Sequence, residues 1–286
     1  MRPANIVTSV SDVLAGIAIS GFFAHSYSNQ SQISSIILLC ISTVGLYGGG
    51  VVFNDVFDAE LDKIERPERA IPQGTVTVAE ASILATILLL AGIAIAFFVN
   101  VLSGWLAVAI AVAALVYDKW GKHHFLIGPL NMGLCRGLNL LLGVSIISLQ
   151  VSSVWYVAFV PIVYIASITM ISRGEVHGGS KALLYFAALL YTLVVASVLL
   201  FSIRNHAILF TSVFLLAFAV MIYSPLVKAI QQPIGKNIGK AVKAGVIALI
   251  LLNASWAVAF GSLWVAVIIL LLLPVSLFLA KLFAVT

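Results

Sequence analysis

The chain has 286 residues, of which 62% are hydrophobic and only 9% are charged, and its formal net charge is +5. A soluble domain typically carries about 25% charged residues, so this composition excludes an ordinary soluble protein. The basic excess does not indicate nucleic-acid binding, because in so apolar a chain basic residues first report orientation in a membrane. We therefore expect an all-α, multi-pass integral membrane protein that contacts membrane lipid and no nucleic acid.

Apolar runs long enough to cross a bilayer as helices recur along the whole chain. They predict nine to ten transmembrane helices in a single domain over residues 1–286, since the fourth run is short and the last could be peripheral. The candidate spans are 4–24, 33–53, 80–99, 103–117, 126–148, 153–171, 182–202, 207–227, 243–261 and 263–283.

The links between the spans differ in charge. The links after the second, fourth, sixth and eighth spans, with both termini and the adjoining span ends, hold the basic residues of the chain apart from Arg136 and Arg204. The links after the odd spans, such as 26–32, 100–104 and 150–153, are short and uncharged. The positive-inside rule places the charged links in the cytoplasm. We expect the functional loops on the cytoplasmic side of the membrane.

The link after the second span is strongly acidic, because six of the ten acidic residues fall between Asp55 and Glu68. If a helix continues over 54–62, Asp55, Asp58 and Asp62 lie on one stripe of it. Mg²⁺ prefers oxygen ligands and usually bridges a few carboxylates to substrate phosphates. We predict that Asn54, Asp55, Asp58 and Asp62 form a magnesium site. The alternative is a solvated, negatively charged helix end.

Basic residues that could hold a diphosphate lie just after this stretch, in the link after the fourth span and inside the fifth span. They are Arg66, Arg69, Lys119, Lys122 and Arg136. Arg66, Lys119 and Lys122 could instead serve only to orient the chain. Arg136 lies inside an apolar span, where a charge is costly unless it faces a partner or a polar cavity. Its neighbours Asn131 and Asn139 could line the same cavity or form structural hydrogen bonds.

Two further places carry polar residues in unusual positions. In the first span, Asn5 could border a pocket near the cytoplasmic end, while Asp12 lies deeper and needs a partner. After the sixth span, Glu175 and His177 could converge, because Gly178 and Gly179 favour a loop. They form a weaker magnesium site than two aspartates, since imidazole suits zinc, copper or iron better.

The acidic link and the Glu175 link lie four spans apart. This spacing suggests a duplicated helical bundle, with halves of about 1–150 and 151–286.

The residues also match a known family. Asn54-Asp55-x-x-Asp58-x-x-x-Asp62, followed by Arg69-Ala70-Ile71-Pro72-Gln73-Gly74, resembles the NDxxDxxxD and RPxPxG signature of the UbiA superfamily of membrane prenyltransferases. The segments 117–122 and 128–143 resemble later motifs of the family. The resemblance covers nearly the whole chain. It implies a helical bundle with a central cavity that opens toward the cytoplasm and toward lipid.

The resemblance also implies an activity and a site. Members bind Mg²⁺ and an isoprenoid diphosphate donor, and pass the isoprenoid group to a small, possibly aromatic acceptor. Carried over to this chain, the catalytic residues are Asp55, Asp58, Asp62, Lys122 and Arg136. The substrate-binding residues are Asn5, Asn54, Arg69, Tyr117, Lys119, Asn131, Arg136, Glu175 and His177. The metal ligands are Asn54, Asp55, Asp58, Asp62 and Glu175.

The chain departs from the family in its second acidic motif. Ordinary members carry a DxxxD sequence after the sixth helix, whereas this chain has Ser172-Arg173-Gly174-Glu175-Val176-His177 there. This variant resembles the EboC-like branch, whose members occur in bacterial clusters for a secondary metabolite. The resemblance implies a bacterial inner membrane as the location. The departure leaves a second hypothesis open: a non-catalytic member that binds or transports a lipid-like metabolite.

Overall fold

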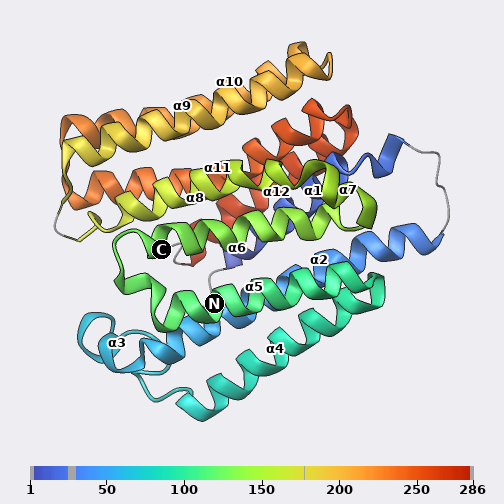
Figure 1. Ribbon diagram of the computed structural model, residues 1–286. Coiled ribbons are helices and arrows are strands. Elements are labelled where there is room, and N and C mark those ends of the chain that lie inside the picture. Colours follow the sequence, from blue (N-terminus) through green and yellow to red (C-terminus); the bar gives the residue numbers. More distant parts are fainter. Residues whose placement is uncertain (1–2, 25–29, 177, 284–286) are drawn as a thin grey trace.

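The computed structural model describes residues 3–24, 30–176 and 178–283, which form an all-helical bundle (Figure 1). The α-helices are α1 (Pro3–Ile19), α2 (Gln30–Phe57), α3 (Ala59–Glu65), α4 (Val78–Val99), α5 (Val101–Lys119), α6 (Ile127–Val144), α7 (Ser148–Val154), α8 (Phe159–Ser172), α9 (Lys181–Arg204), α10 (Ile208–Gln231), α11 (Gly235–Ala259) and α12 (Leu263–Leu282). Three 3-10 helices are η1 (Phe22–Ala24), η2 (Gly121–His123) and η3 (Trp155–Ala158).

The helices confirm a multi-pass membrane protein. Within the described ranges, eight helical stretches are long and apolar enough to cross a bilayer. Two further predicted spans are also helical: α1 has 17 residues, and α6 has 18 residues that include Arg136 and two asparagines. One predicted link is wrong, because residues 150–153 lie within the short helix α7. The predicted link at 26–32 falls largely outside the described residues, and α2 begins at Gln30.

The side chains on the outside of the bundle are apolar. Leu200 of α9, Leu209 of α10 and Phe98 of α4 are 67%, 72% and 82% exposed. Such surfaces belong against lipid, since a soluble protein rarely leaves large contiguous apolar faces in water. By contrast, α11 is buried along most of its length and forms the centre of the bundle.

Glycines allow α1 and α6 to approach closely. A Cβ atom built on Gly16 of α1 would lie 2.1 Å from the carbonyl oxygen of Leu140, and one on Gly143 of α6 would lie 2.1 Å from that of Val13. Small residues at helix contacts are typical of membrane bundles, where van der Waals packing holds helices together. This approach brings Asp12 of α1 beside Arg136 of α6.

The links alternate between the two ends of the bundle. The links after α2, α5, α8 and α10 lie at the left end in Figure 1, and those after α4, α6, α9 and α11 lie at the right end. The charged links are therefore together at one end. The difference in loop charge along the sequence becomes a difference between two ends of the molecule.

Candidate functional site

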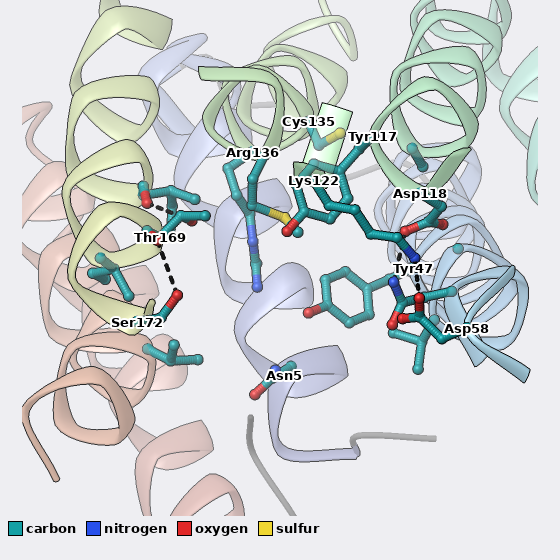
Figure 2. A pocket seen from close by; sticks show the side chains of 18 of the residues that line it. Asn5, Tyr47, Asp58, Tyr117, Asp118, Lys122, Cys135, Arg136, Thr169 and Ser172 are labelled. Carbon is teal, nitrogen blue, oxygen red and sulfur yellow. Dashed lines mark hydrogen bonds and ion pairs between the residues drawn. The ribbon is translucent and has the colours of Figure 1, made fainter. Parts of the chain in front are cut away.

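A cavity of about 410 Å³ opens among α1, α2, α3, α5, α6, α8 and α11. Most of its charged residues come from the end of α5 and from the links after α2 and α5, and Figure 2 shows Asp58, Lys122 and Asp118 close together. The rest of the lining is mostly apolar. It includes Leu46, Ile110, Met132, Ile165, Ile168, Val242 and Val246. A ligand with a polar head and an apolar tail matches this division.

The acidic stretch is not one continuous helix. Helix α2 ends at Phe57 and α3 begins at Ala59, with Asp58 between them at φ −90° and ψ 1°. The Asp58 side chain does not cap α3 and instead contacts Lys122. The break is slight, since Asp58 N still donates to Asn54 O at 3.0 Å and Asp62 N to Asp58 O at 2.8 Å. The three aspartates therefore stay close together.

Each of these aspartates contacts a cation. Arg69 Nη1 lies 2.6 Å from Asp62 Oδ2 and 3.3 Å from Asp55 Oδ1. Lys122, which lies in η2, forms a short contact with the Asp58 carboxylate. The Asp62 side chain is only 6% exposed, so its charge depends on Arg69 for compensation. Asn54 Nδ2 donates to Asp118 Oδ1 at 3.0 Å.

The opposite wall of the cavity comes from α8 and the link after it. Thr169, Ser172 and Glu175 line it, so this wall offers two hydroxyls and one carboxylate. Figure 2 shows Thr169 and Ser172 across from Asp58, with the Arg136 side chain reaching down between the two walls. Arg136 stacks over Tyr47, with its Cζ atom 4.9 Å from the ring centroid.

Arg136 and Asp12 are partners of each other, which satisfies the need for a partner that each has inside an apolar span. Arg136 Nη1 donates to Asp12 Oδ2 at 2.8 Å, and Nη2 donates to Thr8 Oγ1 at 2.9 Å. Asn253 of α11 donates to Asp12 Oδ1 at 2.8 Å, and Asn139 donates to Asp12 Oδ2 at 3.1 Å. Asp12 is 1% exposed, so this network joins α1, α6 and α11 around one buried carboxylate.

The structure brings most of the predicted site residues to the cavity and leaves others outside it. Those that line it are Asn5, Asn54, Asp58, Asp62, Arg69, Tyr117, Lys122, Arg136 and Glu175. Asp55 does not line the cavity, but its carboxylate pairs with Arg69, which does. Lys119 is exposed over the Trp120 ring, and Asn131 faces Gly121. His177 lies outside the described residues.

Some polar residues of the site were not predicted as its members. Tyr47 and Thr43 line the cavity from α2, and Asn253 binds Asp12 from α11. Asn253 carried a usable signal, since a polar amide inside an apolar span needs a partner just as Arg136 does. Tyr47 and Thr43 carried none, because single Tyr and Thr residues are common in membrane helices.

The residues present fit a magnesium ion that is shared with a ligand. In the described parts of the chain, no three acidic, histidine or cysteine side chains converge on a point that could hold a metal ion. Mg²⁺ does not need such a cage, because it is usually held by one or two carboxylates together with substrate phosphates. Asp58, Asp62 and the Asn54 amide line the cavity and supply oxygen ligands of that kind.

Known proteins match this chain in sequence and in fold. A digeranylgeranylglyceryl phosphate synthase from Sulfurisphaera tokodaii is 33% identical over 130 residues, which is 45% of this chain and 47% of that protein. This chain thus spans about half the length of that relative. A UbiA homolog from Aeropyrum pernix K1 matches with a TM-score of 0.71 and 18% identity, over 89% of this chain and 98% of the other.

A UbiA homolog from Archaeoglobus fulgidus, solved with DMAPP and Mg²⁺ bound, matches with a TM-score of 0.59 and 14% identity, over 87% of this chain and 99% of the other. At such identities the structural likeness establishes the fold alone. The model of the UbiA prenyltransferase family matches residues 13–229, which is most of the chain. The chain therefore belongs to the UbiA prenyltransferase family.

Proposed function

We propose that this protein is a membrane prenyltransferase, which moves an isoprenoid group from its diphosphate to a small acceptor. The observation that carries the proposal is the division of the cavity. Asn54, Asp58 and Asp62 meet Lys122 and Arg69 at one end, and an apolar lining continues from them. An isoprenoid diphosphate has the same division between a charged head and an apolar tail.

In this proposal the charged residues bind the diphosphate head. Asn54, Asp58 and Asp62 hold Mg²⁺, while Arg69 and Lys122 donate to phosphate oxygens. The bound ion neutralises part of the charge that grows on the leaving diphosphate. Asp55 contributes by orienting Arg69, which it contacts at 3.3 Å. Once they are bound to the diphosphate, these positive groups stabilise the transition state without further reorganisation during the reaction.

Transfer then requires one bond to break and another to form. The bond between the allylic carbon and the diphosphate oxygen breaks, and its electron pair stays on the diphosphate. The acceptor attacks the allylic cation and loses a proton. Arg136 lies deeper and is paired with Asp12, so it suits an acceptor's polar group better than the anionic diphosphate head. Thr169, Ser172 and Glu175 face the same space and can orient an acceptor hydroxyl.

The names of the relatives support one class of acceptor. Digeranylgeranylglyceryl phosphate synthase is named for a prenylated glyceryl phosphate, which favours an acceptor of that kind over an aromatic one. We also propose that the charged end faces the cytoplasm, because the positive-inside rule applies to its links. The EboC-like branch and a bacterial inner membrane remain predictions.

One observation favours a second candidate function. The wall formed by α8 and the link after it carries one carboxylate, Glu175, rather than two, so the site could bind an isoprenoid diphosphate or a similar lipid without transferring it. The test is to incubate the protein in lipid with radiolabelled isoprenyl diphosphates, Mg²⁺ and a cell extract that supplies acceptors. Transfer of label to a new product that mass spectrometry identifies supports the enzyme. Saturable donor binding with no product from any chain length contradicts it and supports the binding protein.

A further inference from the structure

Arg173 connects the variant second motif to the link between α5 and α6. Its Nη2 donates to the carbonyl oxygen of His124 at 2.7 Å and to that of Lys122 at 3.3 Å. Its guanidinium also lies over the Phe125 ring, 5.4 Å from the centroid. One side chain from the link after α8 thus contacts three residues of the link after α5.

The segment that Arg173 contacts carries Lys122 into the site. Lys122 lies in η2 and its ammonium reaches the Asp58 carboxylate. The next residues pack little against the rest of the protein, since Phe125, Leu126 and Ile127 are 52%, 58% and 51% exposed. A segment with few buried contacts opens easily unless other bonds hold it. Within the segment, the amides of Leu126 and Ile127 donate to His124 Nδ1, and Arg173 adds bonds from outside the segment.

The backbone beneath Arg173 is itself held firmly. Gly179 N donates to Pro233 O at 3.1 Å, in the link between α10 and α11. A Cβ atom built on Gly235 would lie 2.1 Å from the carbonyl oxygen of Glu175, so the two links are in close contact. Arg173 therefore extends from a fixed backbone toward the segment that it contacts.

We propose that Arg173 is a positioning residue, which fixes Lys122 against Asp58 by bridging the carbonyls of Lys122 and His124. The variant motif after α8 then contributes hydrogen bonds to the link after α5, in place of a second set of acidic metal ligands. Arginine suits this role because its planar guanidinium presents several donors in a rigid fork, whereas lysine presents a point charge. The consequence for diphosphate binding rests on the proposed function of Lys122.

The first test measures the segment itself. Hydrogen exchange would be followed in the full-length protein in lipid nanodiscs for wild type, Arg173→Met, Arg173→Lys and the control Arg204→Met. Arg204 is an exposed arginine and the last residue of α9, which ends at the opposite end of the bundle from Arg173. Arg173→Met should speed exchange over residues 121–128 by about fivefold, the loss expected for one or two net hydrogen bonds. Arg173→Lys should recover part of the protection. Exchange equal to that of the control would overturn the proposal.

The second test asks whether Arg173 acts through Lys122. The probe is geranyl diphosphate with Mg²⁺, and its dissociation constant is measured for Arg173→Met, Lys122→Met and the double variant. Arg173→Met should weaken binding about fivefold in the native background and not further once Lys122 is Met, because coupled residues are not additive. Equal losses in both backgrounds would overturn the positioning role. If the native protein binds no diphosphate, the proposed function fails, while the exchange measurement still decides whether Arg173 fixes the segment.

Discussion

Arg69 Nη1 lies 2.6 Å from Asp62 Oδ2 and 3.3 Å from Asp55 Oδ1, so one guanidinium joins two of the three aspartates of the acidic stretch. Lys122 contacts the third, Asp58. The carboxylates are thus compensated by the chain's own cations. A metal ion that binds there has to compete with Arg69 and Lys122, unless a diphosphate draws these two side chains away.

This arrangement predicts that Mg²⁺ and the diphosphate bind cooperatively. Mg²⁺ alone should bind weakly, and a saturating isoprenyl diphosphate should tighten its binding by about tenfold or more, in the range of ordinary coupling between two ligands. By linkage, Mg²⁺ should tighten diphosphate binding by the same factor. Titration calorimetry in both orders measures the two factors. Mg²⁺ affinity that is the same with and without diphosphate would contradict the account.

Asp58→Asn tests the metal assignment at one residue. The substitution keeps the size of the side chain but removes the charge that faces Lys122 and the cavity. Mg²⁺-dependent donor binding should weaken about tenfold or more, because an ionised oxygen ligand is replaced by a neutral one. The matched control is Glu60→Gln, since Glu60 is exposed and pairs with Lys63. Donor binding by Asp58→Asn that equals the control would refute the assignment.

The buried pair between Asp12 and Arg136 predicts a large effect on stability. Asp12→Asn leaves the Arg136 charge without its carboxylate, and breaking a buried pair in this way typically costs about 3–5 kcal/mol. Removing both charges, as in Asp12→Leu with Arg136→Met, should cost less than the single change. Thermal unfolding in detergent compares the two variants. A single variant that is at least as stable as the double variant would show that the pair is not a buried charge pair.

Gly143 predicts a further effect on stability through helix packing. An alanine Cβ there would lie 2.1 Å from Val13 O and push α1 away from α6, with an expected cost of about 1–3 kcal/mol. Gly50→Ala is the matched control, because its Cβ would meet only the Cβ of Ala114 at an ordinary 3.5 Å. Equal thermal midpoints for the two variants would show that α1 and α6 are not in close contact.

Much of the fold could be predicted from the sequence, because it depends on local composition. The length and apolarity of each run identified the helices, and the cost of a charge in lipid identified Arg136 and Asp12 as residues that need partners. Arg136 and Asp12 contact each other although they are 124 residues apart in the chain, and no spacing rule could have paired them. Their pairing depends on the glycine contact between α1 and α6.

The finer details of the site depend on tertiary structure and escaped prediction. Lys119 and Lys122 are three residues apart in a charged link, yet only Lys122 reaches the cavity. The cause is the end of α5 at Lys119 and the tight turn of η2, which redirect the chain. The break at Asp58 and the short helix α7 likewise follow no periodic pattern in the sequence. The duplication of two halves stays a prediction.

The most direct measurement of the central claim is diphosphate release by the purified protein in lipid. Isoprenyl diphosphates of several chain lengths are each supplied with an acceptor extract. Release by the wild-type protein is measured with Mg²⁺ and with a chelator, and release by Asp58→Asn is measured with Mg²⁺. The account predicts release that requires Mg²⁺ and that falls by at least about tenfold in Asp58→Asn. The reason is that the chelator and the substitution each weaken the electrostatic stabilisation of the leaving diphosphate. Absence of release from every donor tested, or release that persists equally with chelator and in Asp58→Asn, would contradict it.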